Sequence, residues 1–211
     1  MAISLMDLSP REMTDHLGAA LSVYVTAMGY PPGTEMQRAG MWLEHTRRPG
    51  WRAVAAHYTP ESPGAAAAEA QLVGVAYGYC GAPEQWWQQQ VVLGLTHRGL
   101  CRADIAALMS DYFELTELHV LPTAQGRGIG EALARRLLSG RVETNVLLST
   151  PEIHGEGNRA WRLYRRLGFL DVMRSHHFAG DPRPFAILGR TLPLEPPSMT
   201  LPAPRRSGLA R

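Results

Sequence analysis

Residues 120–133, VLPTAQGRGIGEAL, hold three glycines in five residues, between an alternating apolar stretch and a helical one. A strand that runs through glycines into a helix presents free backbone N–H groups at the helix start. The helix dipole adds partial positive charge there, so an anion is the natural occupant. Gly126, Gly128 and Gly130 leave the backbone unobstructed, and Arg127 adds charge. The stretch therefore predicts a site for a phosphate-bearing ligand.

Two common nucleotide-binding motifs do not match this loop. The dinucleotide fingerprint G-x-G-x-x-G needs glycine where this chain has Glu131, and the loop comes late in the chain instead of opening repeated βαβ units. The ATP phosphate loop needs a lysine, but all 21 basic residues here are arginine. The missing lysine also excludes Schiff-base chemistry. The remaining candidate is a ligand whose pyrophosphate lies across the loop but which requires neither of these two motifs.

The composition is that of a globular chain. With 211 residues and 45% hydrophobic content, one domain with a real core is expected. A net charge of +2 gives no reason to expect nucleic acid or an anionic membrane as partner. Cys80 and Cys101 have no metal or redox spacing. The first residues lack a basic signal-peptide segment, and no apolar run approaches the ~20 residues of a membrane span, so a cytoplasmic protein is expected.

Apolar periodicity and turn residues predict alternating strands and helices. Strands are expected at residues 2–8, 51–59, 71–80, 111–121, 145–150, 169–178 and 184–191. Helices are expected at residues 10–28, 34–46, 83–95, 101–110, 128–139 and 158–167. Ser9 caps the first helix, residues 60–70 form a low-complexity hairpin connection, and residues 193–211 form a Pro-rich, loosely docked or disordered tail. This order predicts an α+β fold with a mixed sheet.

Two blocks of the sequence resemble the GNAT superfamily of acetyl-CoA-dependent N-acetyltransferases. ELHVLPTAQGRGIGEAL matches the family signature [QR]-x-x-G-x-[GA], after a strand ending in V-x-P, through Gln125, Gly128 and Gly130. NRAWRLYRRLGF matches the next motif, an Asn followed by a helix with Ala and Leu-Tyr and closed by G-F. With the strand between them, the blocks cover residues 113–170.

The resemblance implies a fold, an activity and a cofactor. A single N-acetyltransferase domain over residues 1–192 would have a mostly antiparallel central sheet flanked by helices. The helices near residues 82–110 would be an extra insertion, because the family often has only a short connection there. The enzyme would transfer acetyl from acetyl-CoA to a primary amine, on a protein lysine or a small molecule, without a metal.

The same resemblance implies which residues bind acetyl-CoA. The loop residues would hold the pyrophosphate through backbone amides, and the preceding strand end would bind the pantetheine arm as an added strand does. The second motif would contribute one further contact. The implied residues are Leu118, His119, Val120, Gln125, Gly126, Arg127, Gly128, Ile129, Gly130 and Asn158.

Acetyl transfer requires a proton acceptor and a proton donor. A lysine-like amine, with a pKa of about 10.4, is mostly protonated at neutral pH, so a base must take its proton. Glu114 and Glu117 qualify. On a regular strand they face opposite sides, but a bulge would change that, so both stay candidates. His119 is expected to be a packing or hydrogen-bonding strand residue. The resemblance makes Tyr164 the acid at the CoA sulfur, although its apolar helical stripe alone indicates a core residue.

Other features leave alternatives open. Three arginines of the last predicted helix are expected on a solvated face: Arg162, Arg165 and Arg166. The alternative is that one of them contacts the adenosine 3′-phosphate of the cofactor. His176 and His177 are adjacent on a strand and so cannot jointly hold a metal. Residues 86–87, Trp-Trp, belong either to a packed satellite helix or to a lid or homodimer surface. A catalytically weak acyl-CoA sensor is an alternative to the enzyme. Nucleic-acid binding by the Arg-rich helix is disfavoured by the net charge.

Overall fold

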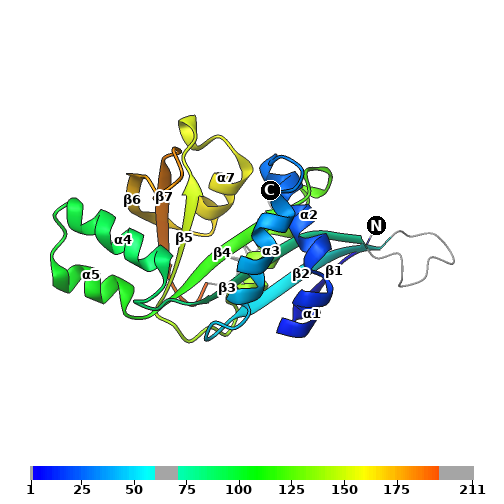
Figure 1. The fold of residues 1–211 in the computed structure, drawn as a ribbon, viewed down its shortest axis with the longest axis horizontal. Helices are drawn as coiled ribbons and strands as arrows, with labels where there is room; N and C mark the ends of the chain where they lie inside the picture. The colour runs from blue at the N-terminus through cyan, green and yellow to red at the C-terminus, as the bar shows by residue number, and fades with distance from the viewer. Residues whose placement is uncertain (1, 60–70, 195–211) are drawn as a thin grey trace, which may run out of the picture.

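Seven strands form one sheet in the computed structural model, which describes residues 2–59 and 71–194 (Figure 1). The strands are β1 (Ala2–Leu8), β2 (Arg52–Thr59), β3 (Gln71–Cys80), β4 (Tyr112–Val120), β5 (Asn145–Pro151), β6 (Leu170–His176) and β7 (Phe185–Thr191). Their order is β1-β2-β3-β4-β5-β7-β6, and every neighbouring pair is antiparallel except β4 and β5. The predicted mixed, mostly antiparallel sheet is confirmed.

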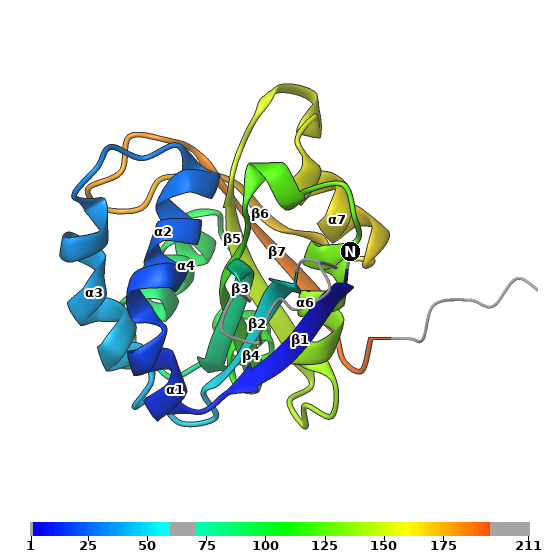
Figure 2. The ribbon, with the colours of Figure 1, turned by 90° about the vertical axis from the view of Figure 1, so that its right-hand side faces the viewer.

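Helices cover both faces of the sheet. They are α1 (Pro10–Asp15), α2 (Leu17–Met28), α3 (Thr34–His45), α4 (Trp86–His97), α5 (Arg102–Met109), α6 (Ile129–Leu138) and α7 (Arg159–Arg166). Two short 3₁₀ turns, η2 (Pro122–Ala124) and η3 (His154–Glu156), were not expected from the sequence. Figure 2 shows α1 to α4 on one side of the sheet and α6 and α7 on the other. Across residues 2–59 and 71–194, no helix is long and apolar enough to cross a membrane.

The single helix predicted over residues 10–28 is in fact two helices. The chain breaks at His16, whose φ of −96° and ψ of 3° end α1 and begin α2. Residues 14–18, Thr-Asp-His-Leu-Gly, include four weak helix formers, which accounts for the break. The predicted cap is present, because the Ser9 hydroxyl accepts the Glu12 N–H at 3.2 Å. The predictions for residues 60–70 and for most of the tail lie outside the described residues.

β4 and β5 run parallel but stay paired for only three residues. The pairs are Tyr112 with Asn145, Phe113 with Val146, and Glu114 with Leu147. Beyond them the strands separate, as Figure 1 shows. Within the described residues, positions 115–120 of β4 therefore have no partner strand on the side that faces β5, and this edge leads directly into the glycine loop.

A bulge interrupts the ladder between β3 and β4. Glu117 lies opposite Tyr77 and Leu115 lies opposite Gly78, so Thr116 is an extra residue on β4. Glycine at position 78 allows the close approach, because a Cβ there would lie 2.1 Å from the Glu114 carbonyl oxygen. The side chains of β4 thus change parity at the bulge.

The inserted helices α4 and α5 pack on the second half of the sheet. Trp87 is buried in a cluster with Val91, Leu95 and Tyr112, and its indole N–H donates to the Ser149 hydroxyl at 3.3 Å. Trp86 is 52% exposed, although its ring lies 5.5 Å from that of Phe178. The two tryptophans therefore differ: Trp87 packs as expected of a satellite helix, whereas Trp86 remains on the surface, where a lid or a homodimer contact stays open.

Replacing Trp87 by alanine should destabilise the protein far more than replacing Trp86. The first variant leaves a cavity in the α4 cluster and should cost roughly 3–5 kcal/mol of unfolding free energy. Trp86→Ala removes mainly exposed surface and should cost less than about 1 kcal/mol. Urea unfolding of both variants measures the difference. Equal losses would show that the insertion is not held by its buried tryptophan.

Candidate functional site

The glycine loop has the backbone shape that its sequence predicts. Gly126 and Gly128 have φ of +80° and +78°, in the left-handed region that glycine favours. Gly128 is the N-cap of α6, and no side chain caps that helix end. A Cβ on Gly130 would lie 3.3 Å from the Leu163 side chain, so the glycine lets α6 approach α7 closely. The loop thus exposes backbone donors at the start of α6.

A cavity of about 360 Å³ lies between the end of β4, the glycine loop and α7. Seven of the ten residues predicted to bind the cofactor line it; His119, Arg127 and Asn158 do not. The full lining is Leu118, Val120, Gln125, Gly126, Gly128, Ile129, Gly130, Glu131, Arg159, Ala160, Arg162, Leu163 and Arg166.

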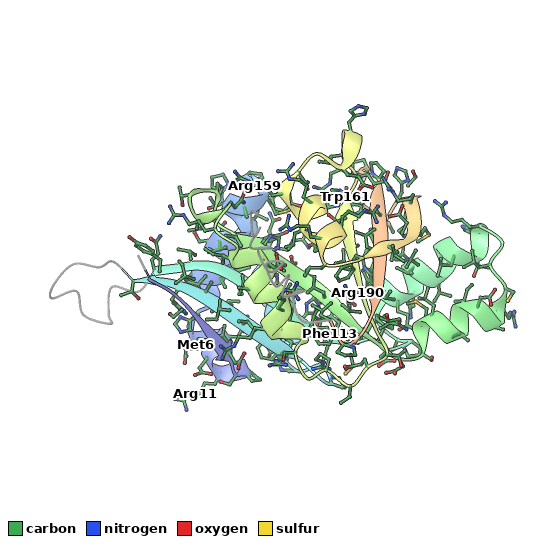
Figure 3. The ribbon with its side chains drawn as sticks, turned by 180° about the vertical axis from the view of Figure 1, so that it is seen from behind. Met6, Arg11, Phe113, Arg159, Trp161 and Arg190 are labelled. Carbon is green, nitrogen blue, oxygen red and sulfur yellow. The ribbon has the colours of Figure 1, made fainter. Side chains whose placement is uncertain are left out.

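Gln125 anchors the loop to both of its neighbours. Its amide Nε2 donates to the Val120 carbonyl at 2.9 Å, and its Oε1 accepts from the Arg159 guanidinium at 2.8 Å. Arg159, labelled in Figure 3, therefore ties α7 to the loop. This role of Arg159 could not be predicted from the sequence, because nothing in the motif separates Arg159 from a solvated residue.

Asn158 and Arg165 have structural partners. Asn158 caps α7, since its Oδ1 accepts the Trp161 N–H at 2.9 Å. Arg165 is only partly on the expected solvated face, since 32% of its side chain is exposed. Its guanidinium pairs with Glu156 at 2.7 Å and with Asp171 at 2.6 Å, and it lies over the Trp161 ring. An α-helix has 3.6 residues per turn, so Arg165 is rotated by about 100° around the helix axis from the adjacent Arg166.

The bulge places both candidate carboxylates on one face of the sheet. Glu114 lies opposite Tyr79, and Glu117 lies opposite Tyr77, two positions further along β3. Alternate residues of a strand share a face, so the opposite orientation expected for a regular strand is wrong here. The two tyrosines belong to the core cluster that β3 forms with α2 and α3, and the carboxylates face that layer.

Glu114 is a buried carboxyl group. Its side chain accepts from the Tyr79 hydroxyl at 3.3 Å and from the Thr116 hydroxyl at 3.4 Å. Its second oxygen is buried and has no hydrogen-bond partner within the described residues. Burial raises the pKa of Glu114 to about 8, although the Arg48 charge opposes this rise. Glu114 is therefore largely protonated at neutral pH.

Glu117 is the more accessible of the two carboxylates. Its Oε2 lies 2.5 Å from the Nε2 atom of His119, and the two side chains are 16% and 10% exposed. The Tyr24 ring of α2 packs edge-on against the His119 ring, with centroids 5.0 Å apart. His119 thus makes the hydrogen bond expected of a polar strand residue, and that bond fixes the Glu117 carboxylate.

Tyr164 lies on α7, in the layer opposite α2 (Figure 2). Its ring packs in the core, 5.7 Å from that of Phe169. Burial raises the pKa of Tyr164, and the Glu117 charge raises it further. The phenol is therefore protonated at neutral pH and lies within electrostatic reach of Glu117.

The two adjacent histidines are not paired. His176 is buried, with its ring edge-on to Phe178 at 4.6 Å, whereas His177 is exposed. Within the part of the chain that the structure describes, no three His, Cys, Asp or Glu side chains form a group that could hold a metal ion.

Comparison with known proteins gives consistent matches. Residues 66–170 match the family model described as "Acetyltransferase (GNAT) domain". The GCN5-like protein acetyltransferase Rv2170 of Mycobacterium tuberculosis (strain ATCC 25618 / H37Rv) is 66% identical over 206 residues, which cover 92% of this chain and 100% of the relative.

Two solved structures share the fold. Arabidopsis thaliana NAA60 in complex with acetyl-CoA has a TM-score of 0.57 and 16% identity, over 90% of this chain and 99% of its own. A phosphinothricin acetyltransferase from Sinorhizobium meliloti, in complex with acetyl-CoA, has a TM-score of 0.57 and 18% identity, over 91% of this chain and 89% of its own.

Replacing Glu114 by glutamine should make stability less dependent on pH. The folded pKa of about 8 lies above the ordinary value of 4.5, so the folded state keeps this proton longer than the unfolded chain does. The protonated Glu114 therefore contributes fully to the free energy of unfolding below pH 4.5. This contribution is lost as the pH rises to about 8, by at most about 1.4 kcal/mol per pH unit. Urea unfolding should show that the free energy of unfolding of the variant, relative to that of the wild type, is higher at about pH 8 than at about pH 5. A difference in free energy of unfolding between the two proteins that does not change with pH would contradict this prediction.

Proposed function

The chain belongs to the GNAT family of acetyltransferases, and from this premise we propose how its residues transfer an acetyl group to an amine. As a family member it is an acyltransferase that takes the acetyl group from acetyl-CoA. The proposal depends above all on one observation, the unpaired edge of β4 that runs into the glycine loop beside the cavity. That edge and that loop offer backbone groups to the two parts of the cofactor.

The pyrophosphate is proposed to lie across the glycine loop. The backbone amides from Gly126 to Gly130 and the dipole of α6 favour an anion there. The pantetheine arm would then follow residues 118–120, where β4 has no strand partner toward β5, and would hydrogen-bond as an added strand does. This path leads the thioester to the place where β4 and β5 separate, between the two helical layers.

Glu117 is the proposed general base. The acceptor ammonium gives its proton to Glu117, and the neutral amine attacks the thioester carbonyl carbon. A C–N bond forms and the C–S bond breaks. The CoA thiolate takes the proton of Tyr164, and the attacking nitrogen gives its second proton to the Tyr164 phenolate, which leaves a neutral amide and the CoA thiol. Glu114 is less suited to the first step, because its carboxyl group is already protonated at neutral pH and is 3% exposed.

A protein amine is the proposed acceptor. The relative that is 66% identical is named a protein acetyltransferase, and most of this chain aligns with it. The chain itself has no lysine, so a lysine acetylated in an assay can belong only to the acceptor. A cytoplasmic location and a homodimer, both expected from the sequence, stay predictions.

Acetyl-CoA and CoA should stabilise the protein against heat, whereas NAD and ATP should not. At 100 times its dissociation constant a ligand adds about 2.7 kcal/mol, which is roughly 5–10 °C for a chain of this size. Gly128→Glu should abolish the shift, because it places a carboxylate where the pyrophosphate lies.

Gly140→Glu is the matched control for that variant. Gly140 also has a positive φ, of +69°, and no neighbour within 4 Å of an added Cβ, but it follows the far end of α6. Both variants therefore carry a similar backbone cost, and only the first reaches the cavity. A normal thermal shift with acetyl-CoA in Gly128→Glu, or loss of the shift in both variants, would contradict the proposal that the pyrophosphate binds at the loop.

Glu117→Gln and Tyr164→Phe should each lower kcat by about 100-fold, within the range of general acid–base catalysis. The thermal shift with acetyl-CoA should be retained, because neither side chain lines the cavity. Acetyl transfer to a lysine-bearing peptide measures turnover. Glu114→Gln should keep most of its activity. If Glu117→Gln kept normal turnover and Glu114→Gln lost it, the general base would be Glu114 and not Glu117.

A further inference from the structure

α7 presents three arginines along one face. Arg159, Arg162 and Arg166 are three and four residues apart, so they lie on one side of the helix. All three line the cavity, and all three are exposed. Their row extends over about 10 Å of helix, which is longer than a single phosphate group.

Structural pairing does not account for this row. Glu131 is the one acidic side chain in the cavity lining, and it bonds Arg135 at 2.9 Å while lying 3.7 Å from Arg166. Arg159 bonds the neutral Gln125 side chain, and Arg162 bonds the Gly157 carbonyl. Arg165, by contrast, does not line the cavity and pairs with two carboxylates. The cavity therefore has an excess of positive charge toward α7.

We propose that Arg162 and Arg166 form a subsite for a phosphate monoester, the 3′-phosphate of CoA, and that Arg159 supports it by fixing the glycine loop. This inference rests on the proposed seat of the pyrophosphate, which takes the loop amides and leaves the arginines for a second phosphate. A monoester carries about −1.5 to −2 charges at pH 7, and guanidinium groups match its oxygens with two parallel hydrogen bonds. The enzyme thereby selects CoA over its 3′-dephospho form.

The test compares the affinities of CoA and 3′-dephospho-CoA for the full chain by calorimetry. The wild type should bind CoA at least about tenfold more tightly, as one charge-assisted contact would give. Arg162→Gln and Arg166→Gln should each weaken CoA by about tenfold and leave 3′-dephospho-CoA nearly unchanged, so that the preference collapses. Arg11→Gln, on α1 far from Arg159 in Figure 3, removes the same charge and should keep the preference.

Two results would overturn the subsite and can be told apart. Equal wild-type affinity for both compounds, or variants that weaken both compounds equally, would remove the 3′-phosphate from the arginines while CoA still binds at the loop. Failure of the wild type to bind either compound would instead overturn the proposed cofactor seat, and the subsite with it.

Discussion

The parting of β4 from β5 is the constraint on which the rest of the site depends. Three residue pairs hold the parallel strands together, and beyond Glu114 none of the seven described strands lies beside this edge of β4. Side chains hold the two sides of the gap in place: Gln125 donates to Val120 on one side, and the buried Trp161 donates to the Pro151 carbonyl on the other. Backbone N–H and C=O groups along such an edge need hydrogen-bond partners, so an edge kept open in this way is suited to a ligand with amide groups of its own.

Much of this arrangement could be predicted from the sequence, because it depends on local patterns. Alternation locates the strands, and glycines that need a positive φ locate the turn into α6. The break at His16 follows from weak helix propensity, but tertiary packing often overrides such propensity, so the sequence did not decide it. Thr116 gives no local sign of a bulge, because a bulge is a property of the pairing between two strands.

The rest could not be predicted, because it depends on how each helix is rotated against its neighbours. Trp86 and Trp87 are chemically identical and adjacent, yet only Trp87 is buried. Arg165 and Arg166 differ in the same way, since Arg165 pairs with two carboxylates while Arg166 lines the cavity. Rotation is fixed by contacts between segments far apart in the chain, as between Trp87 and Ser149. A sequence motif names the helix but not the side that each residue faces.

The bulge also decides how the charge of the site is distributed. It brings Glu114 and Glu117 to one face, where the Glu117 charge further opposes ionisation of Glu114. Two donors, from Tyr79 and Thr116, favour the Glu114 carboxylate but do not outweigh its burial. Near neutral pH Glu114 is therefore largely protonated. On a regular strand the two carboxyl groups would face opposite layers. A single inserted residue thus puts two similar glutamates on one face, one of them buried and largely protonated, the other partly exposed and within electrostatic reach of Tyr164.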